Sequence, residues 1–146
     1  MATFDKTGKG GTTGHPSNGR TPYLVENTID MSVSGFQPAA NDIVQALDVP
    51  AESIVMNAGI EVLTASPSSV TLDMGDGDTV DIYVDGLDST STGYSAVHQD
   101  VLSTGKIYAS ADTIDIKVLG AQDTSGKVRA WAVMCDISGI DETDNN

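Results

Sequence analysis

Apolar and polar residues alternate along most of residues 23–138, and this period of two constrains the fold more than any other feature. Residues 112–119 show it most clearly, because Ile114, Ile116 and Val118 share one side of an extended strand and charged residues occupy the other. Turns rich in Gly, Asp and Ser separate the alternating runs, and no run has three turns of amphipathic helix. The pattern predicts an all-β domain, an eight-stranded antiparallel β-sandwich or jelly roll.

The eight expected strands cover residues 28–34, 42–49, 53–65, 70–74, 80–84, 106–110, 112–119 and 127–137. Residues 67–69 are expected to form a hairpin turn, and residues 75–78 a second turn. In the strand over 80–84, Val80, Ile82 and Val84 should face the core, which leaves Tyr83 on the outer side.

Two of these strands, 53–65 and 127–137, carry apolar residues on both faces. Such strands are expected at the centre of a sheet that is covered twice. In the first, Gly59 indicates a bulge or a close approach of another group to the backbone. In the second, Trp131 fits a core or subunit contact better than a ligand platform. A domain of this size cannot cover both faces by itself, which predicts self-association as a homotrimer.

The sequence divides into an extended N-terminal arm (1–22), the β-sandwich domain (23–138) and an acidic C-terminal tail (139–146). The arm contains five Gly, two Pro and only Met1 and Phe4 as large apolar residues. This composition buries too little apolar surface to offset the entropy of ordering the chain. The arm should therefore be held by contacts outside itself, on a neighbouring subunit.

Charge is distributed unevenly along the chain, whose formal net charge is −14. The arm has three basic residues and one acidic residue, whereas the domain has four basic and seventeen acidic residues. So acidic a domain disfavours nucleic acid and anionic membranes as partners. A basic arm on an acidic domain can instead reach an acidic neighbour, including another copy of the chain.

The single cysteine, Cys135, lies in an apolar run and is expected to be a small buried residue, which leaves no disulfide within the chain. The sequence has no apolar N-terminal stretch of the secretory kind and no window long enough to span a bilayer. These features predict synthesis in a cytoplasm, which does not exclude release within a particle.

No catalytic, cofactor or metal site is expected. The six acidic residues between Asp73 and Asp88 do not have the spacing of an EF-hand, so they are interpreted as a solvated turn and strand face, with a calcium site as the alternative. Neither a G-x-S-x-G nucleophile motif nor a complete phosphate-binding loop is present, and His15 and His98 are isolated. A glycosidase pair of carboxylates has no support from the sequence beyond the number of acidic residues.

Four stretches, 42–66, 70–93, 106–120 and 126–138, resemble the capsid decoration, or cement, proteins of tailed bacteriophages. The most specific parts are D-x-G-D-G-D at 73–78, Y-x-x-A-D-T-I-D-I at 108–116 and K-V-R-A-W-A at 127–132. The resemblance covers about 110 residues and excludes the arm and the tail. It implies a jelly-roll or related β-sandwich, a trimer at three-fold or quasi-three-fold positions on the outside of the head, and the major capsid protein as partner.

The resulting hypothesis is a non-enzymatic virion protein, made in the host bacterial cytoplasm, that cements the outer surface of an icosahedral capsid. A fibre-head domain or a module that binds host glycans as a receptor is the alternative. The residues expected to bind a partner are the apolar anchors and the basic groups of the arm and its junction: Phe4, Lys6, Lys9, Arg20 and Tyr23.

Overall fold

The computed structural model describes residues 1–5, 21–67, 69–94 and 105–137. Within them the protein consists of strands and turns with no helix, and so with no helix able to cross a membrane. Ten strands are present: β1 (Thr3–Asp5), β2 (Tyr23–Asp30), β3 (Ile43–Val49), β4 (Ser53–Thr64), β5 (Thr71–Gly75), β6 (Val84–Asp88), β7 (Gly93–Tyr94), β8 (Lys106–Tyr108), β9 (Asp112–Leu119) and β10 (Lys127–Asp136).

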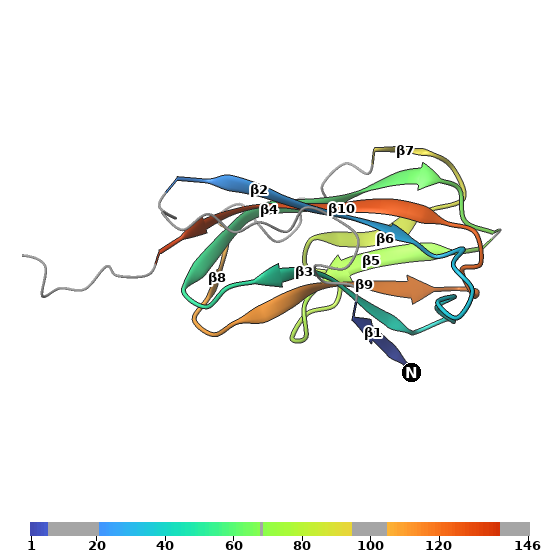
Figure 1. Cartoon of the computed structure of the whole chain (residues 1–146), viewed down its shortest axis with the longest axis horizontal. Coiled ribbons are helices and arrows are strands. Elements are labelled where there is room, and N and C mark those ends of the chain that lie inside the picture. The colour runs from blue at the N-terminus through green and yellow to red at the C-terminus, as the bar shows by residue number, and fades with distance from the viewer. Residues whose placement is uncertain (6–20, 68, 95–104, 138–146) are drawn as a thin grey trace, which may run out of the picture.

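The strands form two sheets packed face to face, which confirms the expected sandwich. One sheet has the order β1-β3-β9-β5-β6, and the other has the order β2-β10-β4-β7 with β8 also paired to β4. Figure 1 shows β2, β4 and β10 in the upper layer and β3 and β9 in the lower layer. All pairings are antiparallel except that of β1 with β3, which is parallel.

Eight of the strands reproduce the jelly roll. When β1 and β7 are set aside, the first strand pairs with the last (β2 with β10) and the second with the seventh (β3 with β9). The third pairs with the sixth (β4 with β8) and the fourth with the fifth (β5 with β6). This nested antiparallel pairing winds one long hairpin into two sheets. The two extra strands are the short edge segments β1 and β7.

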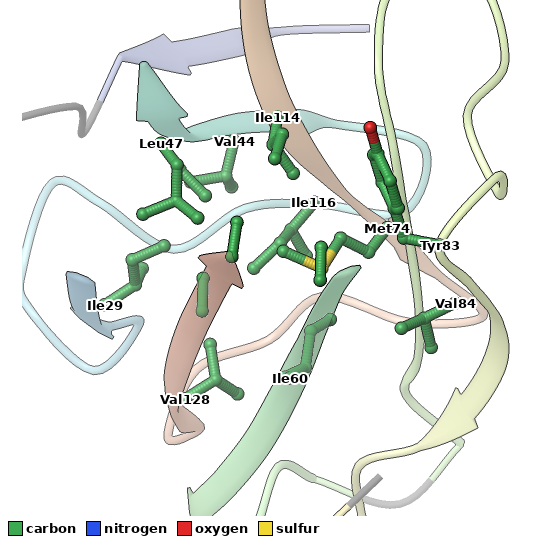
Figure 2. Packing of buried hydrophobic residues seen from close by; sticks show 14 of the residues in the cluster. Ile29, Val44, Leu47, Ile60, Met74, Tyr83, Val84, Ile114, Ile116 and Val128 are labelled. Carbon is green, nitrogen blue, oxygen red and sulfur yellow. The ribbon is translucent and has the colours of Figure 1, made fainter. Parts of the chain in front are cut away.

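The core fills the space between the sheets with alternate residues of the long strands (Figure 2). From β9 these are the predicted Ile114, Ile116 and Val118, all fully buried. From β10 they are Val128, Ala130, Ala132 and Met134, also fully buried. Each large aliphatic side chain removed from water in this way contributes about 1.5–3 kcal/mol to folding. The period of two therefore both forms the strands and supplies the core.

Three local predictions were wrong. The first strand was expected over 28–34, but it spans Tyr23–Asp30, and Met31 lies in a turn although its side chain is buried. The turn begins there because the Asp30 carboxylate accepts the Ser32 backbone N–H at 3.0 Å. The hairpin turn expected at 67–69 is also wrong, because the flanking strands β4 and β5 belong to different sheets.

The strand expected over 80–84 begins only at Val84, and Tyr83 is fully buried instead of facing outward. The Asp76 carboxylate accepts the backbone N–H groups of Asp78 and Thr79 at 3.0 and 2.9 Å, so the turn after β5 is wider than two residues. The buried Tyr83 hydroxyl has a hydrogen-bond partner, because it lies 2.6 Å from the hydroxyl of Tyr108.

Candidate interaction surface

The expected arm residues are placed in two separate parts of the domain or lie outside the described residues. Phe4 belongs to β1 and packs edge-on against Phe36, with ring centroids 5.2 Å apart. Tyr23 begins β2, on the other sheet, and pairs with Met134 of β10. Partial burial, together with the charge of Asp136, raises the pKa of Tyr23. Lys6, Lys9 and Arg20 lie outside the described residues, as do His15 and His98. Phe4 and Tyr23, the two that are described, therefore lie on different sheets.

The exposed large apolar side chains of the strands gather on one face. They are Leu24 of β2, Met56 and Leu63 of β4 and Ile107 of β8, with exposures of 58%, 47%, 39% and 62%. The three strands involved all belong to the sheet that contains β2, β10, β4 and β8. We call the outward side of these strands the outer face. Its β10 residues are the half-buried Trp131, Val133 and Cys135.

Strand register arranges the outer face into rows. Leu24, Val133 and Asn57 are opposite one another on β2, β10 and β4, and the next row contains Glu26, Trp131 and Gly59. At the β8 side, Cys135 pairs with Ile54 and Ile54 with Ile107. Each of the four strands thus contributes apolar side chains to an apolar region on this face, which includes Leu24, Val133, Cys135, Ile54 and Ile107 and is interrupted by the polar Asn57.

A register shift in β4 explains why this strand is apolar on both sides. The pairing of β10 with β4 is irregular between Val133 and Met134. On one side of the shift Ser53 and Val55 point into the core, and on the other side Ala58, Ile60 and Val62 do so. The bulge reverses which residues face outward. Met56, exposed at 47%, consequently lies next to the irregularity on the outer face.

Gly59 is required by Trp131. A Cβ at Gly59 would lie 2.7 Å from the Cζ2 atom of the indole ring, closer than real contacts allow. The ring thus lies over the glycine of the adjacent strand, which confirms the predicted close approach at this position. Trp131 is part of the outer face rather than of the core.

Charged residues border the apolar region at the opposite end of the same strands. Arg129 forms an ion pair with Glu61 of β4, and its second terminal nitrogen lies 3.8 Å from Glu26 of β2. Lys127 pairs with Asp30 at 2.8 Å. A shallow depression on this face is lined by Leu24, Glu26, Glu61, Arg129 and Trp131. Two of the four basic residues of the domain are thereby placed on this face, so its local charge is nearly balanced.

The other sheet is different on its outward side. Its central strand β9 presents Thr113, Asp115 and Lys117, and the adjacent β3 presents Ile43, Gln45 and Asp48. This side is mostly polar, and these residues are half-buried rather than fully exposed. The two outward sides of the sandwich therefore differ, because the large exposed apolar side chains of the strands lie on the outer face.

Part of the acidic cluster is buried, which corrects its interpretation as a solvated turn. Asp76 is 1% exposed and Asp73 is 7% exposed. Asp76 accepts hydrogen bonds from the Lys106 ammonium group and, at 2.6 Å, from the Tyr108 hydroxyl. Burial opposes ionisation of Asp76, but these hydrogen bonds outweigh it and hold the pKa below the usual value. The network ties the turn after β5 to β8.

The carboxylates between Asp73 and Asp88 were also considered as a calcium site. Among the described residues, no three His, Cys, Asp or Glu side chains come close enough together to hold a metal ion. Asp73 lies opposite Lys117 of β9, on the side of the sheet away from the core, and accepts the Gly86 backbone N–H at 2.8 Å, while burial raises its pKa. The buried polar groups of this region are thus used to hold the fold together.

Sequence reasoning did not identify Leu24, Met56 or Ile107 as surface residues of one region. The alternation within β10 did indicate that Trp131 and Val133 share a side. Which residues of β2, β4 and β8 accompany them depends on pairing between segments far apart in the chain, and on the bulge. No local signal contains that information.

No protein-family model and no curated protein matches the sequence. Three solved chains do match the structure. A chain from the capsid of Ralstonia phage GP4 has a TM-score of 0.67 and 14% identity, and the match covers 90% of this chain and 97% of that one. A chain from the cyanophage Pam1 capsid asymmetric unit has a TM-score of 0.61 and 16% identity over 84% of this chain and 89% of that one.

The third chain comes from the acidic stable capsid structure of Helicobacter pylori bacteriophage KHP30, with a TM-score of 0.58 and 16% identity over 82% of this chain and 91% of that one. In each comparison the match covers most of both chains, so the likeness concerns the entire domain rather than a shared motif. The chain therefore has the same fold as chains found in the capsids of three different bacteriophages.

Proposed function

We propose that the protein is a structural component of a bacteriophage virion that decorates the outside of the capsid and cements neighbouring major capsid subunits as a homotrimer. The observation that carries this proposal is the likeness, over most of both chains, to chains from three phage capsids. The proposed activity is binding alone, and no chemical step is assigned to the protein.

The outer face supports the part of the proposal that concerns contact. An apolar region that crosses the strands and is bordered by charged pairs has the character of a protein interface, with a desolvated centre and a polar rim. Contiguous exposed apolar surface is uncommon on monomers that do not bind a partner. A stable contact would bury on the order of 1,500 Å² or more.

The experiment is quantitative decoration of capsids that lack the protein. Purified protein is added to such particles, and the bound copies are counted by mass spectrometry of the washed capsids. The proposal predicts saturation at a fixed stoichiometry, together with a rise in the temperature at which the capsids release their contents. Absence of saturable binding would reject it. Sedimentation of the free protein at micromolar concentration tests the trimer separately, and a clean monomer would reject that part.

Paired variants test the outer face. Leu24→Asn combined with Ile107→Asn should reduce either trimer formation or capsid occupancy by at least tenfold, because both side chains lie in the apolar region. Val33→Asn is the matched control, since Val33 is 52% exposed but lies in the turn after β2. Equal trimer formation and equal capsid occupancy of the two variants would show that the outer face is not a contact surface.

The arm belongs to the same proposal. We expect it to fasten the domain to a neighbouring capsid or cement subunit, with Phe4 and Tyr23 as apolar anchors and the arm's basic residues, Lys6, Lys9 and Arg20, facing acidic surface. Exposed ion pairs contribute only about 0.2–1 kcal/mol each, so apolar and backbone contacts must provide most of the affinity. Deleting residues 2–20 should leave a folded domain that occupies capsids less well. Undiminished occupancy would show that the arm is not needed.

A receptor-binding module is the second candidate, and the depression beside Trp131 favours it. The indole is flanked by Glu26, Glu61 and Arg129, so an aromatic surface adjoins groups able to hydrogen-bond a sugar. Trp131 is the only tryptophan, and its fluorescence therefore reports directly on this depression. Titration with glycans from the host surface should quench or shift the emission if the module binds them. An unchanged spectrum at millimolar glycan rejects this candidate.

A further inference from the structure

We infer that β1 is exchanged between copies, so that Met1–Asp5 of one protomer occupies, on a neighbouring protomer, the place at the edge of β3 that it has on its own domain. This inference rests on the proposed self-assembly. It assigns to the arm both a specific docking site and a specific partner, a second copy of this chain. The occupant is known because the structure shows the segment in place (Figure 1).

The docking site is defined by backbone and side-chain contacts. Thr3, Phe4 and Asp5 pair in parallel with Ile43, Val44 and Gln45 of β3. The Ala2 backbone N–H donates to the Asp42 carboxylate at 2.6 Å, and the Ile43 N–H donates to the Ala2 carbonyl at 2.9 Å. Asp42 is only 7% exposed and is held in turn by the Ala39 N–H at 2.9 Å. Each copy therefore presents a preformed site for this strand.

An aromatic contact adds specificity. Phe4 is partly buried and meets the buried Phe36 with an angle of 77° between the ring planes. Edge-on aromatic pairs contribute about 0.5–1.5 kcal/mol beyond the area that they bury. Every contact described for Phe4 and Ala2 involves groups that are identical on a neighbouring copy, so exchange loses none of them.

The connection to the next strand permits the exchange. Seventeen residues separate Asp5 from Tyr23, and an extended chain of that length reaches roughly 55–60 Å. Within an assembly that already holds neighbouring copies side by side, both placements of the strand are closures of a tethered segment, and the small dependence of closure entropy on length then favours neither strongly. Exchange of a terminal element is a low-cost route to association.

Charge favours an exchange within an assembly of this chain. The residues between the two strands include Lys6, Lys9 and Arg20, whereas the β-sandwich domain has a formal charge of −13 from its four basic and seventeen acidic residues. Two such domains held side by side repel each other. A basic segment that crosses from one domain to the next lowers that repulsion, which a segment returning to its own domain does less effectively.

A disulfide trap tests which copy supplies β1. Thr3 and Ile43 are opposite each other in the pairing, and Thr3 is exposed, so Thr3→Cys with Ile43→Cys places two thiols within bonding reach. The variant is made with Cys135→Ser, which removes the native thiol. The assembled protein is oxidised and then run on a denaturing gel without reductant. Exchange predicts covalently linked chains, and a monomer with an internal bond overturns the inference.

A matched pair controls for nonspecific crosslinking. Asp48→Cys with Thr113→Cys joins β3 to β9 inside the domain and should give only an internal bond. A second arm of the experiment mixes chains carrying Thr3→Cys alone with chains carrying Ile43→Cys alone, before assembly. A linked heterodimer is expected only if the strand crosses between copies, and its absence overturns the inference.

Sedimentation of the same variants separates this inference from the proposed function. An oligomer with only internal bonds overturns strand exchange and leaves the decoration proposal intact. A monomer at all concentrations overturns both the exchange and the proposed trimer, and capsid occupancy then decides the remainder of the functional proposal on its own.

Discussion

Trp131 lies over Gly59 on the neighbouring strand, with the indole ring occupying the space that a Cβ at Gly59 would need. The pair sits on the outer face, between the apolar region and the charged pairs around Arg129. A single glycine thus determines how an aromatic side chain presents its surface. This relationship makes the outer face testable without altering any of its exposed apolar residues.

Gly59→Ala should displace the indole and lower the free energy of unfolding by about 1–3 kcal/mol, the usual cost of adding a methyl group to a filled site. Since Trp131 is the only tryptophan, its emission should move to longer wavelength. Gly77→Ala is the control, because nothing lies within 4 Å of a Cβ at that position. An unchanged spectrum for Gly59→Ala would contradict the described packing.

Tyr108→Phe should destabilise the fold by about 1.5–3 kcal/mol, because the lost hydrogen bond goes to a buried carboxylate. The Tyr108 hydroxyl lies 2.6 Å from Asp76, which is almost fully buried. Tyr83→Phe removes a neutral contact to the same hydroxyl and should cost only about 0.5–1.5 kcal/mol. Urea unfolding measures both losses of stability. A larger loss for Tyr83→Phe would mean that the charge of the Asp76 carboxylate is not what makes the Tyr108 hydrogen bond important.

Asp115 should make the protein less stable as the pH rises from about 4 to about 6. Burial is the main cause that raises the pKa of Asp115 to about 6 from an ordinary 3.8, with a further contribution from the charge of Asp112. In this pH range the folded state binds more protons than the unfolded state, so stability falls with increasing pH. Asp115→Asn should remove that fall and raise the stability above pH 6 by about 1–3 kcal/mol.

Asp30→Asn should change the free energy of unfolding in the opposite direction to Asp115→Asn, and it serves as the comparison. The Lys127 ammonium group and Ser32 lower the pKa of Asp30 to about 2. Its contribution is present above the ordinary carboxyl pKa and is lost as the pH falls through about 2. The Asp30 side chain is 32% exposed, so solvent screens its ion pair, and its effect should be small and should weaken in high salt. Unfolding measured between pH 3 and 8 would contradict both assignments if the two variants shifted in the same direction.

Removal of divalent cations should leave the stability unchanged. The Asp73 and Asp76 carboxylates already accept hydrogen bonds from Gly86 and from Lys106 and Tyr108, respectively. Thermal unfolding with and without a chelator measures the effect. A loss of more than about 2 kcal/mol on chelation would instead assign a calcium site to the residues between Asp73 and Asp88.

The sequence by itself determined the class of fold and the composition of its core. Alternation in residues 112–119 identified a strand whose inward residues are the ones found buried, because the pleat turns successive side chains to opposite sides wherever a strand forms. In residues 127–137 it separated the buried set from the outward set, but both sets are apolar and the sequence did not show which one faces the core. Gly59 was predicted to mark either a bulge or a close approach to the backbone, and the structure shows the close approach, by the Trp131 ring. These features depend only on residues that are close together in the sequence.

Tertiary structure decided the features that depend on distant segments. The Asp73–Asp88 residues look like a solvated turn in sequence, but Asp76 is buried because Lys106 and Tyr108, some thirty residues later, compensate its charge. The irregular pairing of β4 with β10 moves Met56 to the outer face. The arm composition shows no strand, yet Thr3–Asp5 forms one at the edge of β3, where the backbone groups of an existing sheet supply partners that a short chain lacks alone.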